Sequence, residues 1–171
     1  AIIVLAILIS AAVAGWSAAP WLPTLPRQRR HLLDHLNLDP GQTVVDLGCG
    51  DGSLLFAIAR QHPDVVCTGY DISLLPLTIA WARKLASFKA YRHVHIRFGN
   101  LFKQRINQAD VIFIFLLNRC YQKLVRSLRG RVGSQARVIV EAWPLPELEP
   151  VKTLQAPNLL PVFIYTGKDL R

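Results

Sequence analysis

Residues 111–117 read Val-Ile-Phe-Ile-Phe-Leu-Leu, an apolar run that contains no polar side chain. Such a run is typical of a strand in the middle of a parallel sheet, because helices cover both faces of that sheet. A strand with one face in water would alternate apolar and polar residues. We therefore expect these residues to form a central strand of a sheet that is buried on both sides.

The segments around this run alternate between strand and helix patterns. Strands are predicted at residues 43–47, 65–71, 94–98, 111–117 and 137–142, and helices at residues 27–38, 52–61, 74–91 and 121–128. Five prolines interrupt the region after residue 143 and leave residues 151–154 and 159–165 as an antiparallel pair at one edge of the sheet. This order predicts an α/β fold with a doubly wound, mostly parallel, seven-stranded sheet.

A glycine-rich segment follows the first predicted strand, where residues 46–52 read Asp-Leu-Gly-Cys-Gly-Asp-Gly. Ligands of open α/β sheets bind outside the carboxyl ends of the strands. Glycine lets the backbone turn and approach a ligand closely, and the helix that follows offers free N–H groups to an anionic group. The segment therefore predicts a binding site for a nucleotide-like ligand.

The spacing of the glycines separates two classes of nucleotide-like cofactor. A dinucleotide fingerprint, G-x-G-x-x-G, requires glycine at position 53, where this chain has Ser53. The chain instead has Gly48, Gly50 and Gly52 at alternate positions after Asp46, and this pattern resembles the first motif of class I S-adenosylmethionine-dependent methyltransferases. The resemblance implies S-adenosyl-L-methionine as the cofactor.

Two further polar residues fit this cofactor. Asp71 ends the second predicted strand, where its carboxylate can accept hydrogen bonds from both ribose hydroxyls. Asn100 follows the third predicted strand, where class I methyltransferases usually carry an acid or amide that meets the adenine amino group. Each residue also has a simpler explanation, because Asp71 can cap the helix near Ser73 and Asn100 can be a turn residue.

Taken together and in this order, the motifs predict one cofactor site. We expect Asp46 and the glycine-rich loop to hold the methionine part of the cofactor. Asp71 is expected to hold the ribose, and Asn100 with Leu101 the adenine. The predicted cofactor-binding residues are Asp46, Leu47, Gly48, Cys49, Gly50, Asp51, Gly52, Asp71, Ile72, Asn100 and Leu101.

The first part of the chain differs from the rest. Residues 1–19 carry no charged side chain, and their polar residues are Ser10 and Ser17. As a helix they would span roughly 28 Å, close to the thickness of the hydrocarbon layer of a bilayer. We therefore expect one transmembrane helix at residues 1–19, a proline-rich connector at residues 20–26 and the methyltransferase domain at residues 27–171.

Three arginines follow the predicted transmembrane helix, at positions 27, 29 and 30. Positive charges next to a membrane span favour the cytoplasmic side. We therefore expect a single-pass membrane protein whose catalytic domain lies on the cytoplasmic side. A cleaved signal peptide is the alternative, because residues 12–14 read Ala-Val-Ala and resemble a cleavage site.

The chain also resembles a particular group of class I enzymes, the membrane-anchored lysine methyltransferases of the ATP synthase c subunit and their prokaryotic relatives. The resemblance rests on the apolar N-terminal segment, the connector at residues 23–26, the loop at residues 46–52, residues 110–117 with the basic helix after them, and residues 137–146. It implies a Rossmann-like methyltransferase fold and a protein-lysine N-methyltransferase that acts at a membrane surface. Methylation of a small-molecule or lipidic acceptor and a non-catalytic membrane scaffold remain as alternatives.

No catalytic residue is assigned from the sequence. Thr24 and the end of the strand at residues 113–117 are expected to form the acceptor channel. Asn118 and Glu141 lie at the correct edge of the sheet, but each can equally satisfy local backbone groups. A lysine acceptor must lose its proton before it attacks a methyl group, and a dry channel favours the neutral amine.

The balance of charges favours an anionic partner, since Lys and Arg outnumber Asp and Glu by 20 to 11. We expect no nucleic acid substrate, because the chain has neither an Asn-Pro-Pro-aromatic motif nor a Pro-Cys pair. Cys49, Cys67 and Cys120 match neither a disulfide framework nor a zinc pattern. His93 and His95 share a strand face without a third ligand nearby, so no metal is expected.

Overall fold

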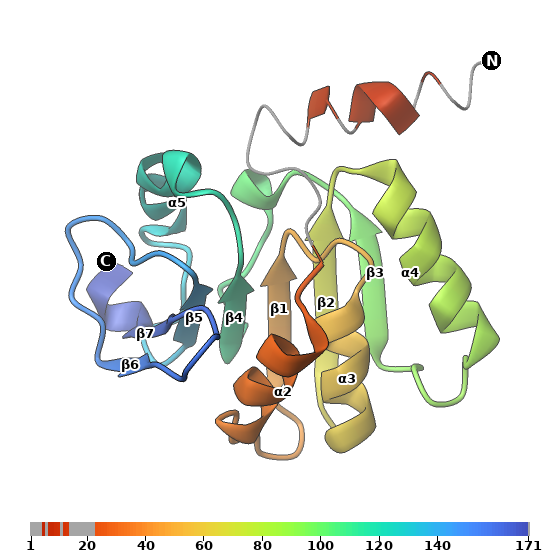
Figure 1. Cartoon of the computed structure of the whole chain (residues 1–171), viewed down its shortest axis with the longest axis horizontal. Helices are drawn as coiled ribbons and strands as arrows, with labels where there is room; N and C mark the ends of the chain where they lie inside the picture. The colour runs from red at the N-terminus through yellow and green to blue at the C-terminus, as the bar shows by residue number, and fades with distance from the viewer. Residues whose placement is uncertain (1–4, 6, 11, 14–22, 171) are drawn as a thin grey trace.

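The computed structural model describes residues 5, 7–10, 12–13 and 23–170. Within them, a seven-stranded sheet has the strand order β3-β2-β1-β4-β5-β7-β6 (Figure 1). The first five strands pair in parallel, and β7 lies antiparallel to both of its neighbours. The predicted parallel sheet and antiparallel edge pair are therefore confirmed. The strands are β1 (Thr43–Leu47), β2 (Val66–Asp71), β3 (Val94–Phe98), β4 (Val111–Ile114), β5 (Arg137–Glu141), β6 (Lys152–Leu154) and β7 (Val162–Thr166).

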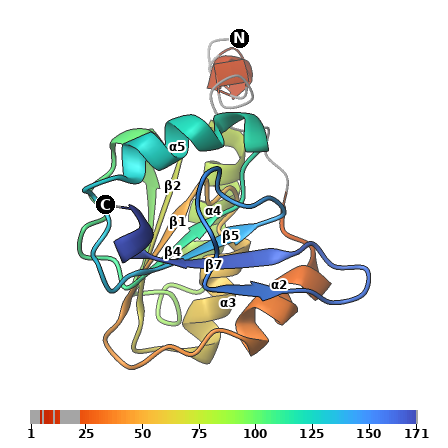
Figure 2. The same ribbon diagram turned by 90° about the vertical axis from the view of Figure 1, so that its left-hand side faces the viewer.

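Helices cover both faces of this sheet (Figures 1 and 2). β4 contributes side chains to the core on each face of the sheet. Ile112 packs in the core on the side of α5, whereas Phe113 packs in the core on the side of the other three helices. The doubly wound architecture is therefore confirmed. The helices are α2 (Pro26–Asp34), α3 (Ser53–Gln61), α4 (Leu74–Ala86) and α5 (Tyr121–Leu128), with short 3-10 helices η1 (Leu101–Lys103), η2 (Asn118–Cys120) and η3 (Gly167–Leu170).

The strand predicted at residues 111–117 ends at Ile114. The ladder stops there because Ile114 pairs with Leu47, the last residue of β1, and with Val140 near the end of β5. Residues 115–117 continue without regular secondary structure, and Leu116 is buried in the core. The apolar run therefore reflects burial beyond the end of the ladder, and the prediction of a longer strand was wrong.

The helices predicted at residues 27–38 and 74–91 are also shorter in the structure, where they end at Asp34 and Ala86. Side chains beyond each end still belong to the core, as Leu36 and Tyr91 do. The apolar spacing therefore extended past the helices themselves.

The transmembrane helix predicted at residues 1–19 is wrong. In the part of the chain that the structure describes, no helix combines the length and the apolar character that crossing a bilayer requires. Residues 1–4, 6, 11 and 14–19 of that segment lie outside the described residues. Ser10 is buried, and its hydroxyl accepts a hydrogen bond of 3.0 Å from the N–H of Leu74 at the start of α4.

Composition alone did not reveal this contact, because the hydrogen bond joins Ser10 to a residue 64 positions later in the chain. The described residues of the segment, red in Figure 1, lie above β2, β3 and the start of α4. The cytoplasmic location predicted for the domain stays a prediction.

The connector and α2 lie next to the sheet edge that carries the glycine-rich loop. Residues 23–25 have no regular secondary structure, and residues 20–22 of the predicted connector lie outside the described part of the chain. Gln28 in α2 is buried, and its Nε2 donates to the carbonyl of Leu160 at 3.0 Å. The N–H of Leu160 donates in return to Gln28 Oε1 at 2.9 Å. This pair fixes α2, and with it the position of Thr24.

Candidate active site

The loop after β1 turns sharply because Gly48, Gly50 and Gly52 have φ angles of +96°, +53° and +70°. Positive φ is strained for residues with a side chain but open to glycine. The N–H groups of Gly48 and Cys49 both donate to the carbonyl of Tyr70 in β2, at 2.8 and 3.1 Å. These two hydrogen bonds hold the loop backbone at the carboxyl ends of two neighbouring strands, β1 and β2.

Asp71, the last residue of β2, connects this loop to the next helix. Its Oδ2 accepts a hydrogen bond of 2.8 Å from the N–H of Gly50, and its Oδ1 accepts one of 2.8 Å from the N–H of Ser73. Burial raises the pKa of Asp71, and these backbone hydrogen bonds lower it in part. Each carboxylate oxygen keeps a lone pair for a ligand, so Asp71 can serve as a cap and as a ligand at once.

Asp51 anchors the other side of the loop. Its Oδ1 accepts from the N–H of Ser53 at 3.1 Å, and its Oδ2 forms a salt bridge of 3.1 Å with Arg83 of α4. Arg83 also donates to the carbonyl of Asp51 at 3.0 Å. The loop is thus attached to both α3 and α4.

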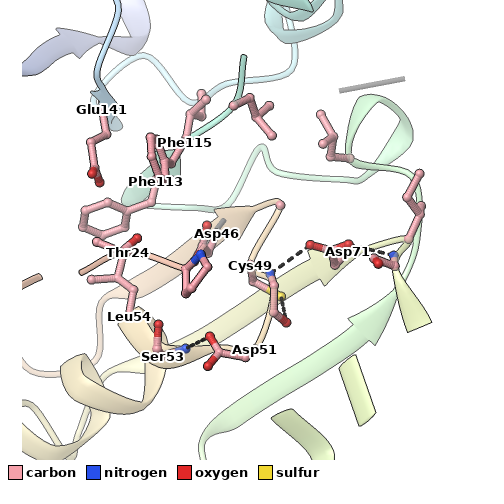
Figure 3. Close-up of a pocket in the computed structure, with 18 of the residues that line it drawn as sticks. Thr24, Asp46, Cys49, Asp51, Ser53, Leu54, Asp71, Phe113, Phe115 and Glu141 are labelled. Atoms are coloured by element: carbon pink, nitrogen blue, oxygen red, sulfur yellow. Dashed lines mark hydrogen bonds between the residues drawn. The ribbon is translucent and has the colours of Figure 1, made fainter. Parts of the chain in front are cut away.

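The loop and Asp71 line one pocket, shown in Figure 3. Two predicted cofactor-binding residues do not line it: Leu47 is fully buried in the core, and Gly52 is the residue before α3. The structure brings the other predicted residues together in this pocket, namely Asp46, Gly48, Cys49, Gly50, Asp51, Asp71, Ile72, Asn100 and Leu101.

Asn100 has the turn role that the sequence left open. Its Oδ1 accepts a hydrogen bond of 3.0 Å from the N–H of Phe102 and so caps η1. The residue is exposed and also lines the pocket. The capping bond uses one lone pair of Oδ1, which leaves the amide able to bind a further polar group.

Thr24 and residues 113–117, predicted as the acceptor channel, line the same pocket. Glu141 and Trp143 line it as well. The sequence left Glu141 undecided and did not indicate Trp143, although both come at the carboxyl end of a parallel strand, where ligand-binding residues gather.

The charged side chains that line the pocket are all acidic. Burial, together with the negative charges of Asp71, Glu141 and Asp51, raises the pKa of Asp46 to about 8. Burial also raises the pKa of Glu141 to about 7. Among the described residues that line the pocket there is no Lys, Arg or His. The pocket therefore favours a positively charged ligand.

Cys49 lies inside the loop, in an environment that disfavours its thiolate. Burial raises the pKa of its thiol, and the negative charges of Asp46 and Asp71 act in the same direction. A nucleophilic cysteine needs the opposite environment, one that stabilises the thiolate.

The strand order, the glycine-rich loop after β1 and the acid after β2 define a class I S-adenosylmethionine-dependent methyltransferase. Residues 46–152, more than half of the chain, match the family of the ANTKMT methyltransferase domain, and the chain belongs to this family. S-adenosyl-L-methionine is accordingly its cofactor, and the predicted resemblance to class I methyltransferases is confirmed.

Known proteins of the same kind align with most of the chain. A protein-lysine N-methyltransferase of Saccharolobus islandicus (strain REY15A) is 24% identical over 136 residues, which cover 80% of this chain and 84% of the relative. An RNA methyltransferase from Salinibacter ruber, solved with S-adenosyl-L-homocysteine, has a TM-score of 0.76 at 24% identity, over 85% of this chain and 93% of that chain. The rRNA methyltransferase aviRa from Streptomyces viridochromogenes has a TM-score of 0.63 at 18% identity, over 89% of each chain. These two structures share the fold.

The residues of the pocket fit the cofactor. S-adenosyl-L-methionine carries a positive sulfur and a positive amino group, and the pocket offers acidic groups without a basic partner among its described lining residues. The raised pKa of Asp46 is the sign of an acid that lacks such a partner. When bound, the cofactor supplies a methyl group on a positively charged sulfur.

Proposed function

We propose that this methyltransferase acts on lysine side chains of proteins. The observation that carries the proposal is the composition of one side of the pocket. Thr24, Phe113, Phe115 and Glu141 lie together on that side in Figure 3, whereas Cys49 and Asp71 lie on the other. Aromatic rings and a carboxylate together suit an ammonium group, through cation–π attraction and charge.

The similarity to a known enzyme supports the same acceptor. The Saccharolobus islandicus relative carries the name protein-lysine N-methyltransferase, and it aligns with 80% of this chain. The family match at residues 46–152 includes the cofactor loop and the carboxyl ends of β1 to β5.

On this proposal the chain's residues divide into two groups. Asp46 and the loop at residues 48–51 hold the methionine part of the cofactor, Asp71 holds the ribose, and Asn100 with Leu101 contacts the adenine. On the acceptor side, the apolar side chains of residues 113–117 exclude water, which favours the neutral amine that methyl transfer requires.

The test is to label the proteins of cells that lack the gene. An extract of these cells is incubated with the purified full chain and S-adenosyl-L-methionine that carries tritium in the methyl group. The proteins are then hydrolysed to amino acids. We expect tritium to elute with methylated lysine, and we expect a D71N chain, which binds the cofactor weakly, to give far less.

Label in another fraction contradicts the proposal. Tritium confined to the lipid extract, to small molecules or to RNA, with no methylated lysine in the protein hydrolysate, would assign a different acceptor.

A further inference from the structure

Glu141 occupies a rigid position at the end of β5. It pairs with Val162 of β7, and the hydroxyl of Tyr121 donates to its backbone carbonyl at 3.3 Å. Its side chain lines the pocket and the residue is only 4% exposed. Neighbouring elements therefore fix the point from which this carboxyl group faces the pocket.

One oxygen of the Glu141 side chain, Oε1, lacks a hydrogen-bond partner within the described part of the chain. A buried polar atom without a partner is costly and uncommon in native proteins and calls for an explanation, of which a catalytic role is one. Oε1 therefore does not satisfy local backbone groups, which was the simpler explanation left open by the sequence.

Among the described residues, no Lys, Arg or His forms a salt bridge with Glu141 or lines the pocket. Glu141, Phe113 and Thr24 line the same pocket, and their side chains lie on the same side of it in Figure 3. In the part of the chain that the structure describes, the titratable groups that interact with Glu141 are Asp46 of β1 and Tyr121 of α5. Burial raises the pKa of each of them, and the negative charge of Glu141 acts in the same direction. Within the described part of the chain Glu141 thus has no positive partner, and a bound ligand can supply one.

We propose that Glu141 accepts a proton from the ammonium group of the substrate lysine and thereby produces the nucleophilic amine. This inference rests on the proposed function, since it requires a lysine acceptor. In the step, one N–H bond of the ammonium breaks and its electron pair stays on nitrogen as the lone pair. The proton forms an O–H bond with the Glu141 carboxylate, so a charged pair becomes a neutral pair.

The properties of Glu141 match this step. Burial raises the pKa of its carboxyl group to about 7, so it is a stronger base than an exposed glutamate and still half ionised near neutral pH. Conversion of two charges into two neutral groups is favoured in a dry site. Asp46 is the other buried acid, but it lies in the cofactor loop on β1 and is proposed to hold the cofactor.

The test replaces Glu141 in the full chain with Gln, which keeps the shape and removes the base. Glu149→Gln is the matched control, because Glu149 is exposed and does not line the pocket. The rate is the initial formation of tritiated methyllysine in the extract of cells that lack the gene. Binding of S-adenosyl-L-homocysteine and the Tm are measured alongside.

We expect E141Q to bind S-adenosyl-L-homocysteine and to keep its Tm, while the rate at pH 7 falls by about 10²–10⁴-fold, as for loss of a general base. The wild-type rate should rise with pH up to about 7 and then level off. The E141Q rate should lack this plateau and keep rising with pH up to the pKa of free lysine, about 10.4. E141D should restore the plateau in part, and E149Q should match the wild type.

Two results would overturn the inference while leaving lysine methylation intact. One is an E141Q chain with the wild-type rate and pH profile. The other is an E141Q chain that has lost S-adenosyl-L-homocysteine binding or folding, with E141D equally affected, because Glu141 would then be structural. Absence of methyllysine with the wild-type chain would instead contradict the proposed function itself.

Discussion

The carboxylate of Asp71 accepts a hydrogen bond of 2.8 Å from the N–H of Gly50, which lies 21 residues earlier in the chain. The bond joins the end of β2 to the glycine-rich loop after β1. Two motifs that are separate in the sequence therefore form one rigid unit, and the second oxygen of Asp71 fixes the start of α4 through Ser73.

Asp71→Asn should weaken cofactor binding. The amide presents N–H groups where the carboxylate accepts hydrogen bonds, so it opposes the N–H of Gly50 or Ser73. Loss of one hydrogen bond between the ribose and the charged carboxylate amounts to about 1.5–3 kcal/mol. This loss lowers the affinity for S-adenosyl-L-homocysteine about 10- to 100-fold. Titration calorimetry measures this change. Asp64→Asn, at an exposed position, is the control, and equal affinities for both variants would contradict the assignment of Asp71.

Asp46 should make cofactor binding depend on pH. In the free folded chain burial and nearby acids raise its pKa to about 8, so the group is protonated at neutral pH. A bound cation favours the carboxylate, so binding should release a proton and tighten as pH rises towards 8. Calorimetry at neutral pH, in buffers of different ionisation enthalpy, should detect this proton. The same proton release from an Asp46→Asn chain would contradict the prediction.

Raising the pH should strengthen cofactor binding but lower the stability of the free chain, because the pKa of Asp46 is raised in the folded state. A carboxyl group whose pKa is raised in the folded state contributes stability below its unfolded pKa of 3.8, and this stability is lost as pH rises through about 8. In urea, the free energy of unfolding should therefore fall less with pH in the Asp46→Asn chain than in the wild type. Parallel pH dependence of the two chains would contradict the raised pKa.

Gly69→Ala should disturb the loop through packing alone. A methyl group at Gly69 would lie 2.6 Å from both Cys49 Sγ and Leu55 Cδ1, so Cys49 and its loop must move. Overpacking of this kind costs about 1–3 kcal/mol, which corresponds to a fall in Tm of roughly 2–12 °C. We also expect weaker binding of S-adenosyl-L-homocysteine. An unchanged Tm together with unchanged affinity would show that the loop does not depend on this contact.

Gln28→Ala should destabilise the chain by about 1–3 kcal/mol, because the amide makes two hydrogen bonds and its loss leaves the groups of Leu160 without partners. Urea unfolding followed by circular dichroism gives this value. Gln61→Ala, at the exposed end of α3, should change stability by less than about 0.5 kcal/mol. Equal effects at both positions would rule out a special role for Gln28.

The sheet and the cofactor pocket were predictable because they depend on local patterns. The apolar run in β4 required cover on both faces, and the glycines placed the loop at the end of β1. Since the carboxyl ends of parallel strands meet at one edge, the sequence also indicated that Asp71 and Asn100 would lie near that loop.

Other features depend on contacts between distant residues, which no local pattern records. Leu116 is apolar because it is buried beyond the end of the ladder, so the sequence overstated the length of β4. The contact between Ser10 and Leu74 links two segments with no shared motif. That Glu141 Oε1 has no partner among the described residues follows only from the positions of its neighbours in space.

A crystal structure of the full chain with S-adenosyl-L-homocysteine tests the site most directly. We predict that the ribose hydroxyls donate to the carboxylate of Asp71, that the homocysteine part lies against residues 48–51, and that the sulfur faces the side of the pocket with Phe113 and Glu141. A ligand bound in this pocket with its ribose away from Asp71, or bound elsewhere on the domain, would contradict the assignment of both the cofactor residues and the acceptor side.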